Sequence, residues 1–489
     1  METTNCPIFV FNLATPSDRN LLRYLKLQSE LQNRPAGDLI IILLLAISVV
    51  LIRIGSVPAA DSTSDGLELP VIFAITILGN DITSEKFILR EMILKPGMIA
   101  SSEALERDRL KLASLGLFNR VVVEVVEDEG RAVVLVTVTE QWYIYLFPRM
   151  RYNLNEPEEY IVGGGAYHRN FRGLGQQLTA MAWTGKERGY YFAHLDPWFG
   201  WGKNLSISWR GRFEESSIID TLGIEHNRQN FRFGFDNRFR LSDISWIGWG
   251  IQWEEQSSNA LGFTYSGSRK DRLLVESITL QRDARDYRYY PTKGALLRLV
   301  SEFNQMVDEN HYFLRQSIDL RLYRSVQNLI LAGRFIGVAS QKDLPSYRRI
   351  GLSHSLVRSR ASYKSGGGII LALNIETRFN IIPKRYYSFE LFPLVKPYVQ
   401  NMQFSMEGYL YFDAGCNRLT DPEEAKMASN FWAYGLGLHF QLPYVETIHY
   451  AERYGQSRPL PLHGPLNRPH PYLQAGYVLL WDGIFRLHN

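Results

Sequence analysis

The chain has 489 residues, of which 45% are hydrophobic and 13% aromatic, and its mean hydropathy is −0.17. That polar average excludes a polytopic helical membrane protein, which needs many long apolar segments, and the net charge of +4 comes without any basic tract of the kind that binds nucleic acid. A polar chain with many aromatic residues is typical of a membrane β-barrel, although a large soluble β-protein has a similar composition.

The composition offers no residues for cofactor chemistry. The two cysteines, Cys6 and Cys416, have no partner at metal-ligand or redox spacing. The ten histidines are scattered, and no phosphate loop or nucleophile elbow has the strand and helix that it requires. No cofactor and no metal are therefore expected, and nothing predicts an enzyme.

The N-terminal region contains the only long apolar run, residues 39–52. This run is too short to span a membrane comfortably and predicts the core of a signal peptide, with small residues placed for cleavage after Ala59. Residues 1–60 are therefore interpreted as an N-terminal extension with a signal peptide. An uncleaved anchor helix is the alternative.

Residues 68–140 have the pattern of a small α/β domain of order β-α-α-β-β. A β-rich strand ends at the turn Gly79-Asn80, Thr83 is placed to cap a helix, and Gly116 ends a second helix. Two helices on one side of a small sheet bury both apolar faces. The predicted elements are a strand at 71–78, a helix through 87–93, a helix from 101 or 102 to 115, and strands at 121–126 and 133–139.

From residue 142 onward the helical period gives way to alternation of apolar and polar residues, as in Phe231, Phe233 and Phe235, which alternate with Arg232, Gly234 and Asp236. Arginine and aspartate recur on the polar face of successive strands, which a membrane barrel would place in its lumen. About 340 residues at about 20 per strand and turn predict about sixteen strands over residues 141–489.

The α/β segment also resembles a POTRA domain. The resemblance rests on Gly79-Asn80 after the first strand, on the Leu-Lys-Pro-Gly at 94–97, and on the Leu-Gly-Leu-Phe-Asn-Arg-Val at 115–121, which includes Gly116 and Phe118. It implies a domain that binds unfolded polypeptide or partner proteins, partly by strand addition to a sheet edge.

A second motif resembles the "RD-x-RD … PT-x-G" signature of BamA/TamA-type outer-membrane assembly factors. Such a motif marks the end of one barrel strand, a turn, and the start of the next, and an ordinary charged hairpin is the alternative. Together the two resemblances imply a mainly β protein: a transmembrane antiparallel barrel preceded by one POTRA domain. The signature residues are Arg282, Asp283, Arg285, Asp286, Pro291 and Gly294.

Residues 347–363 resemble the long extracellular loop that folds back into barrels of this family. Arg358 matches the arginine of the Val-Arg-Gly-aromatic motif, whereas Ser359 replaces its glycine and Arg360 replaces its aromatic residue. The family's partners of this arginine are acidic residues of the barrel wall, for which Glu376 and Asp413 are the candidates. Alternation independently places both carboxylates on the lumen face, so we expect a loop-to-barrel latch. The alternative is that Arg358, Glu376 and Asp413 are ordinary charged residues that line the lumen.

These resemblances imply an outer-membrane protein with its POTRA domain in the periplasm. The implied function is to take unfolded polypeptide on the POTRA domain and fold it into the membrane, and the alternative is a two-partner secretion pore. The partners expected are unfolded outer-membrane or secreted proteins, the lipid bilayer, and periplasmic chaperones or lipoproteins, but no nucleic acid.

Overall fold

The computed structural model describes residues 70–489 except 129–130, 153–159, 201–203, 220–223, 261–262, 341–343, 349–355, 359–367, 391–395, 419–428, 443–444, 460–477 and 480–489. The predicted signal peptide and Ser359 therefore lie outside the described residues. In the part of the chain that is described, no helix is both long and apolar enough to cross a membrane.

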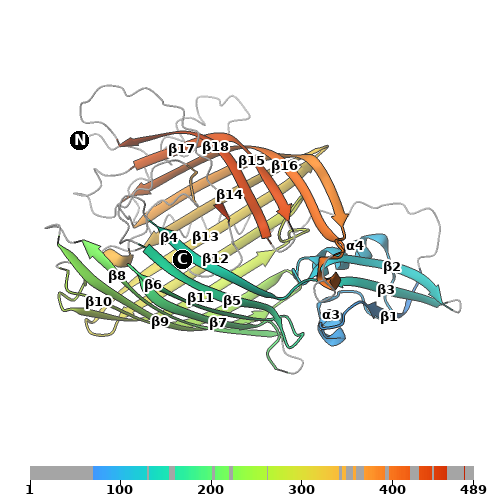
Figure 1. The fold of residues 1–489 in the computed structure, drawn as a ribbon, viewed down its shortest axis with the longest axis horizontal. Helices are drawn as coiled ribbons and strands as arrows, with labels where there is room; N and C mark the ends of the chain where they lie inside the picture. The colour runs from blue at the N-terminus through green and yellow to red at the C-terminus, as the bar shows by residue number, and fades with distance from the viewer. Residues whose placement is uncertain are drawn as a thin grey trace, which may run out of the picture. The chain divides into compact units, whose positions relative to one another are not determined.

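The first described region is a three-stranded sheet with two helices (Figure 1). The strands lie in the order β1-β3-β2, with β1 parallel and β2 antiparallel to the central strand β3. This arrangement leaves β1 and β2 as the edge strands. The elements are β1 (Ile72–Leu78), α3 (Glu85–Glu91), α4 (Ser102–Ala113), β2 (Phe118–Asp128) and β3 (Arg131–Glu140).

The core of this region lies between the helices and one face of the sheet. Ile88 and Leu112 from the two helices, and Val134 and Val136 from β3, have no exposed area. These residues follow the helical and the alternating periods of the sequence, because each element buries a single apolar face.

Helix α3 differs from the predicted helix at both ends. Its N-cap is Ser84, whose side chain makes no cap hydrogen bond, so the predicted cap at Thr83 is wrong. The helix ends at Glu91, before Ile93. The carboxylate of Asp108 on α4 accepts hydrogen bonds from the amides of Ile93 and Leu94 at 2.7 and 2.9 Å, which replaces the helical bonding of these amides. Burial raises the pKa of the Asp108 carboxyl, although both amides favour its ionised form.

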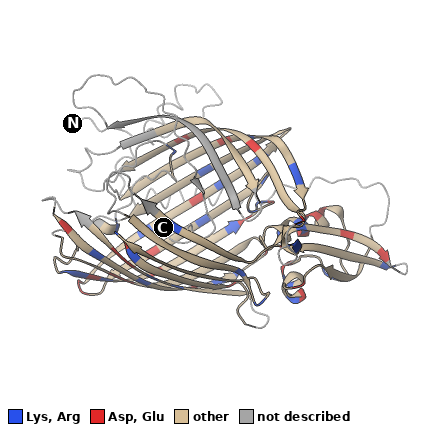
Figure 2. Ribbon diagram, in the orientation of Figure 1, with Lys and Arg blue, Asp and Glu red and all other residues tan. Residues whose placement is uncertain are grey.

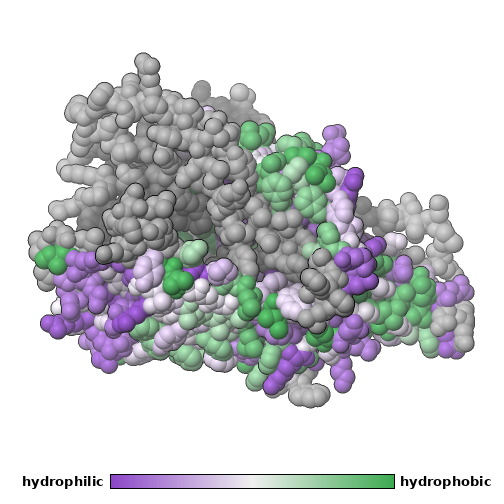
Figure 3. Space-filling view, viewed as in Figure 1, coloured by the Kyte–Doolittle hydropathy of each residue, from purple (hydrophilic) through white to green (hydrophobic). Residues whose placement is uncertain are grey.

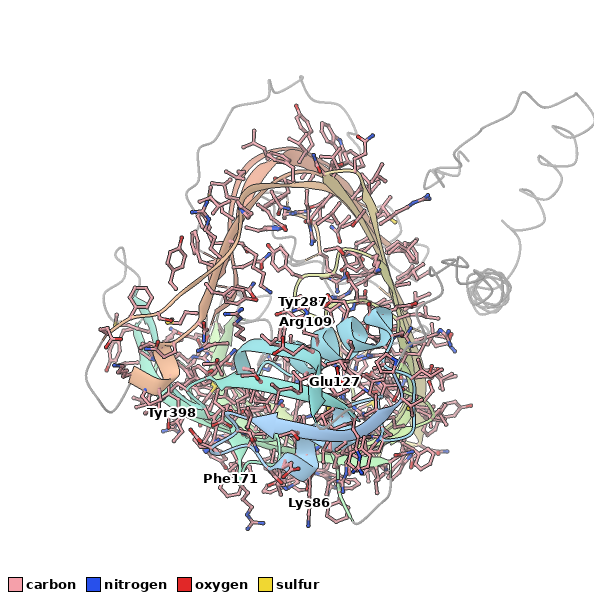
Figure 4. All side chains as sticks on the ribbon, turned by 90° about the vertical axis from the view of Figure 1, so that its right-hand side faces the viewer. Lys86, Arg109, Glu127, Phe171, Tyr287 and Tyr398 are labelled. Atoms are coloured by element: carbon pink, nitrogen blue, oxygen red, sulfur yellow. The ribbon has the colours of Figure 1, made fainter. Side chains whose placement is uncertain are left out.

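The remaining strands form one antiparallel sheet in chain order, β4 to β19, and sixteen strands are described. The sheet curves around a lumen, as the end view in Figure 4 shows. The strands are β4 (Ile144–Tyr152), β5 (Tyr160–Phe171), β6 (Gln176–Gly185), β7 (Arg188–Asp196), β8 (Leu205–Ile219), β9 (Glu225–Arg240), β10 (Ser245–Ser258), β11 (Lys270–Asp283), β12 (Gly294–Met306), β13 (His311–Val326), β14 (Leu329–Ser340), β15 (Ile369–Tyr387), β16 (Met402–Arg418), β17 (Ser429–Leu442), β18 (Val445–Pro459) and β19 (Val478–Leu479), with the short helices η1 (Ser346–Arg348) and η2 (Lys396–Val399) in two connections.

Alternation along these strands separates an apolar outer face from a polar lumen face. On β16, Leu410 and Phe412 are 56% and 40% exposed, whereas Tyr409 and Asp413 are buried. Figure 2 shows charged residues distributed along the strands, and Figure 3 shows hydrophobic residues on the visible outer surface of the sheet. The sheet therefore has the inside-out polarity of a membrane barrel, with β4 and β19 as its end strands. Among the described residues, no backbone pairing joins β4 to β18 or β19.

Candidate functional site

Arg358 lies in the connection between β14 and β15 and binds both predicted carboxylates. Its Nε and Nη2 donate to the two oxygens of Asp413, each at 2.8 Å, and its Nη1 donates to Glu376 at 2.7 Å. The backbone amide of Arg358 also donates to Asp413 at 2.9 Å. The guanidinium therefore makes a bidentate contact with one carboxylate and a single contact with the other.

The register of two neighbouring strands brings these carboxylates together. Asn374 on β15 pairs with Asp413 on β16, and Glu376 pairs with Tyr411. Residues two apart on a strand share a face, so Asn374 and Glu376 both point into the lumen beside Asp413. The latch is thus built on two adjacent strands, whose ladder fixes its geometry.

The site is desolvated and close to electrically balanced. Asp413 has no exposed area, and the side chains of Arg358 and Glu376 are only 19% and 14% exposed. A second guanidinium, that of Arg378, pairs with Glu376 at 2.7 Å, so two carboxylates face two guanidinium groups. The Arg358 guanidinium also lies 3.9 Å from the ring centroid of Tyr411, which stabilises a cation away from water. Removing either partner of an ion pair buried in this way strongly destabilises the protein, because the remaining charge is left buried and unpaired.

Apolar and amide contacts hold the loop beside the ion pairs. Val357 is buried in a cluster that includes Ile370 and Tyr409 from the barrel wall. Asn374 Nδ2 donates to the carbonyl of Leu356 and to Asp413, at 2.8 and 2.9 Å. The sequence did not predict this role of Asn374, because an amide on an alternating strand carries no signal for a loop contact.

The residues of the "RD-x-RD … PT-x-G" motif shape the turn between β11 and β12. Asp283 ends β11 and pairs with Arg285 at 2.7 Å. Asp286 accepts hydrogen bonds from the amides of Thr292 and Lys293 at 3.0 and 3.3 Å, which folds the turn back on itself. Gly294 then starts β12 with a φ of 101°, an angle that favours glycine.

Two other members of that motif lie beside this hydrogen-bonding core. Arg282 is exposed and takes part in none of these contacts. Pro291 is buried next to Thr292 and Lys293, whose amides meet Asp286. The motif therefore combines residues that build the turn with one exposed residue, Arg282, that does not contribute to it.

The predicted POTRA residues occupy turns and the core of the small domain. Gly79 and Gly116 have positive φ angles of 83° and 67°. Asn80 closes the turn after β1 by donating to the carbonyl of Thr83 at 3.0 Å, and Phe118 is buried in the core. These four residues shape the domain.

A polar network joins the small domain to the first barrel hairpin, and the sequence did not predict it. Glu140 accepts hydrogen bonds from the amides of Ile82 and Thr83 at 3.0 and 2.7 Å, and Asn170 Nδ2 donates to the Thr83 hydroxyl at 2.9 Å. The Tyr143 hydroxyl lies 3.0 Å from the same oxygen of Thr83, and burial raises the pKa of Tyr143. Thr83 serves this network instead of capping α3.

A second contact involves the turn between β7 and β8. Trp198 donates its indole N–H to Glu91 at the end of α3, and Arg240 donates to the same carboxylate at 3.2 Å. Two guanidinium groups, those of Arg240 and Arg90, lie 4.1 and 5.1 Å from the centroid of the Trp198 ring. Glu91 is thereby buried with both of its oxygens bound.

Three further turns also contact the small domain. Asn119 Nδ2 donates to the carbonyls of Tyr398 and Gln400 at 2.8 and 3.0 Å, and the amide of Arg288 donates to Ser114 Oγ at 3.1 Å. Lys111 pairs with Asp243 at 3.2 Å. Figure 4 views this end and labels Tyr287 and Tyr398, which belong to two of the turns. The small domain thus contacts the barrel at one end of the strands, opposite to the end at which the Arg358 loop enters.

Comparison with known proteins agrees with this architecture. The model of the Omp85 superfamily domain matches residues 170–446, and the POTRA model, described as a surface antigen variable number repeat, matches residues 70–141. The outer membrane protein assembly factor BamA of Nitratidesulfovibrio vulgaris (strain Hildenborough) is 23% identical over 296 residues, which cover 56% of this chain and 36% of that protein. The chain therefore spans about a third of the length of this curated relative.

One solved structure shares the fold of this chain at low identity. CdiB from Escherichia coli has a TM-score of 0.53 at 12% identity, and the match covers 80% of this chain and 73% of CdiB. BamA from Haemophilus ducreyi lacking POTRA domains 1–3 has a TM-score of 0.45 at 12% identity, with 80% and 82% of the two chains covered.

Proposed function

Because the chain belongs to the Omp85 superfamily, we propose that it is an assembly factor that takes unfolded polypeptide on its POTRA domain and folds it into the outer membrane. Members of this superfamily are assembly and transport proteins rather than enzymes. The POTRA domain lies in the periplasm, where the client and any chaperone or lipoprotein partner would meet it.

The binding of the loop to the lumen wall is the observation that carries the proposal. Arg358 and Val357 reach the inner wall and are held there by two buried ion pairs and an apolar cluster. A polypeptide crossing the lumen would have to displace these contacts, which costs several kcal/mol. Folding at the wall of the barrel leaves them in place.

The edges of the two sheets suggest how a client could be bound. β2 is an edge strand of the POTRA sheet, and β4 is an end strand of the barrel sheet. An edge strand presents unpaired amide and carbonyl groups that can pair with an extended segment. We propose that a client pairs first with the POTRA sheet and then with the barrel edge.

Liposomes that contain the full chain test this function. A urea-unfolded outer-membrane barrel protein is diluted into these liposomes, and its folding is followed by the change in gel mobility of unheated samples. We expect folding to be faster than in liposomes of the same lipid without the protein. Equal folding rates would contradict the proposal.

The Omp85 superfamily also includes two-partner secretion pores, so a secretion pore is the second candidate. A pore that passes an exoprotein would release its client on the far side of the membrane instead of leaving it inserted. Protease protection of the client in the same liposomes separates the two. An inserted client is cut only in its exposed loops, whereas a transported client is protected over its whole length.

A further inference from the structure

The lumen face of strands β8 to β14 carries arginines that are not part of the Arg358 latch. Two of them, Arg238 on β9 and Arg298 on β12, form no ion pair and no hydrogen bond with any residue that the structure describes. The Nε of Arg298 is buried without a hydrogen-bond partner in this part of the chain. Because a cation that loses water without gaining a partner is unfavourable, both positions favour a bound anion.

On β9, the carboxylate next to Arg238 is bound to another arginine. Asp236 lies two residues earlier on the same face of the strand and forms an ion pair with Arg210 on β8. The Arg238 guanidinium instead lies 4.6 Å from the centroid of the Trp246 ring on β10. An aromatic face attracts a cation but does not neutralise its charge.

On β12, the carboxylate opposite Arg298 is occupied in the same way. Arg298 pairs with Asp319 in the register of β12 and β13. Both oxygens of Asp319 accept hydrogen bonds from Arg321 and from Arg334, and the closest contacts are 2.7 and 2.9 Å. These two bidentate contacts fill the accepting positions of the carboxylate, so Asp319 has none left for Arg298.

The two arginines face each other across β10 and β11. Among the described charged groups, Arg298 acts most strongly on Arg238, and the two like charges repel. Gly248 on β10 pairs with Arg238, and Thr279 on β11 pairs with Gly248. A Cβ at Gly248 would lie 3.4 Å from Cγ of Arg238, so the arginine side chain passes over the glycine. Thr279 adds a hydroxyl that can donate to a ligand between the two guanidinium groups.

The arginine pair lies in the part of the lumen that is near the POTRA domain. Arg240, two residues beyond Arg238 on β9, binds Glu91 of that domain. Arg288 in the β11–β12 turn, whose amide binds Ser114 of the same domain, is exposed and adds a positive charge that acts on Arg238. A ligand would therefore reach the pair from the periplasm, and it would be water-soluble because the pair is on the lumen face.

The charges around the pair are not balanced. Five arginines and two aspartates of the described residues meet in this part of the wall, which leaves three positive charges in excess. The neighbouring pair of Glu302 and Arg315, 3.8 Å apart, is neutral. A dianion with several oxygens matches both this excess and the planar donor fork of a guanidinium group. The arginines are Arg210, Arg238, Arg298, Arg321 and Arg334, and the aspartates are Asp236 and Asp319.

We propose that Arg238 and Arg298, with the Thr279 hydroxyl, form a binding site for a water-soluble oxyanion of the phosphate type. The bound anion bridges two cations that otherwise repel each other. The site lies on β9 to β12, whereas Glu376 and Asp413 of the latch belong to β15 and β16.

Equilibrium dialysis of the detergent-solubilised full chain against radiolabelled inorganic phosphate tests this proposal. Saturable binding to the wild type is expected. Arg238→Gln and Arg298→Gln should each weaken it by about tenfold or more, the effect of losing one charged hydrogen bond. Thr279→Val keeps the shape of the side chain and should weaken binding less.

Thermal unfolding gives an independent measurement of the same site. Phosphate should raise the unfolding temperature of the wild type, because a ligand stabilises the folded state that binds it, and should not raise that of the double variant. Without phosphate, the arginine variants should be at least as stable as the wild type, since each removes an unpaired cation. The gel mobility of unheated samples shows whether each barrel has folded, and Thr279→Val carries the test if the arginine variants do not fold.

Arg228→Gln is the matched control, because Arg228 lies on the same face at the other end of β9 and contacts Gln256 at 3.4 Å. It should bind phosphate like the wild type. Absence of saturable binding to the wild type, or an equal loss in Arg228→Gln, would overturn the proposal. Competition by phosphatidylglycerol added to the micelles would also contradict it, because the ligand would then be a lipid. No client is present, so failure here is distinguishable from failure in the client-folding assay.

Discussion

At the scale of single residues, Arg358 joins a loop to two strands through one planar group. Its guanidinium binds two carboxylates and lies against a tyrosine ring, a combination that a lysine ammonium cannot reproduce. The latch therefore depends on the shape of the side chain as well as on its charge.

The first prediction is that Arg358→Ala lowers the client-folding rate at least tenfold while the barrel still forms. The change leaves Asp413 buried with one charged partner fewer, at a local cost of about 3–5 kcal/mol. Arg358→Lys should give an intermediate rate. The liposome folding assay measures both, with Arg324→Ala, an exposed arginine on β13, as control. Wild-type rates in Arg358→Ala would refute the latch.

At the scale of elements, the end of β1 depends on a glycine that packs against β3. Gly79 has a φ of 83°, and a Cβ at this position would overlap the carbonyl oxygen of Val138. Gly97 has a similar φ of 88°, but a Cβ there would meet nothing within 4 Å. The two glycines share a backbone conformation and differ in packing.

The second prediction compares alanine at these two glycines. Gly97→Ala should destabilise the POTRA domain by about 1 kcal/mol, because it adds only the cost of a left-handed backbone. Gly79→Ala should cost clearly more, since the strand must also move away from Val138. Hydrogen exchange of the β1 amides in the full chain measures the difference, and equal exchange in the two variants would contradict the packing argument.

At the scale of the whole molecule, five of the barrel turns that the structure describes contact the POTRA domain. The contact at Glu91 has the clearest energetic consequence, because its carboxylate is buried and accepts from both Trp198 and Arg240. Buried donors that lose their acceptor cost about 1–3 kcal/mol.

The third prediction is that Glu91→Ala loosens this contact and leaves both folds intact. The amide of Ser84, which donates to the carbonyl of Gly173 at 2.9 Å, should then exchange its hydrogen several times faster than in the wild type. Glu103→Ala is the control, since Glu103 forms only an exposed pair with Arg107 on the same domain. Similar exchange in the two variants would show that Glu91 does not hold the domains together.

The sequence alone determined the order of the elements, the lumen face of Glu376 and Asp413, and the glycines at the turns. These features follow from local rules: a strand alternates its side chains with a period of two, a helix buries a stripe, and a positive φ favours glycine. Arg358 was found through its resemblance to a family motif, and the alternation of the strands independently placed its partners.

Only the tertiary structure decided which separated segments meet. Thr83 binds Asn170 instead of capping a helix, Asp108 binds an amide beyond the end of α3, and Arg348 of η1 pairs with Glu254 on β10. None of these pairs has a characteristic spacing, because their partners lie on segments that are distant in the chain. Such contacts depend on the register and curvature of the whole sheet, which no single segment of sequence specifies.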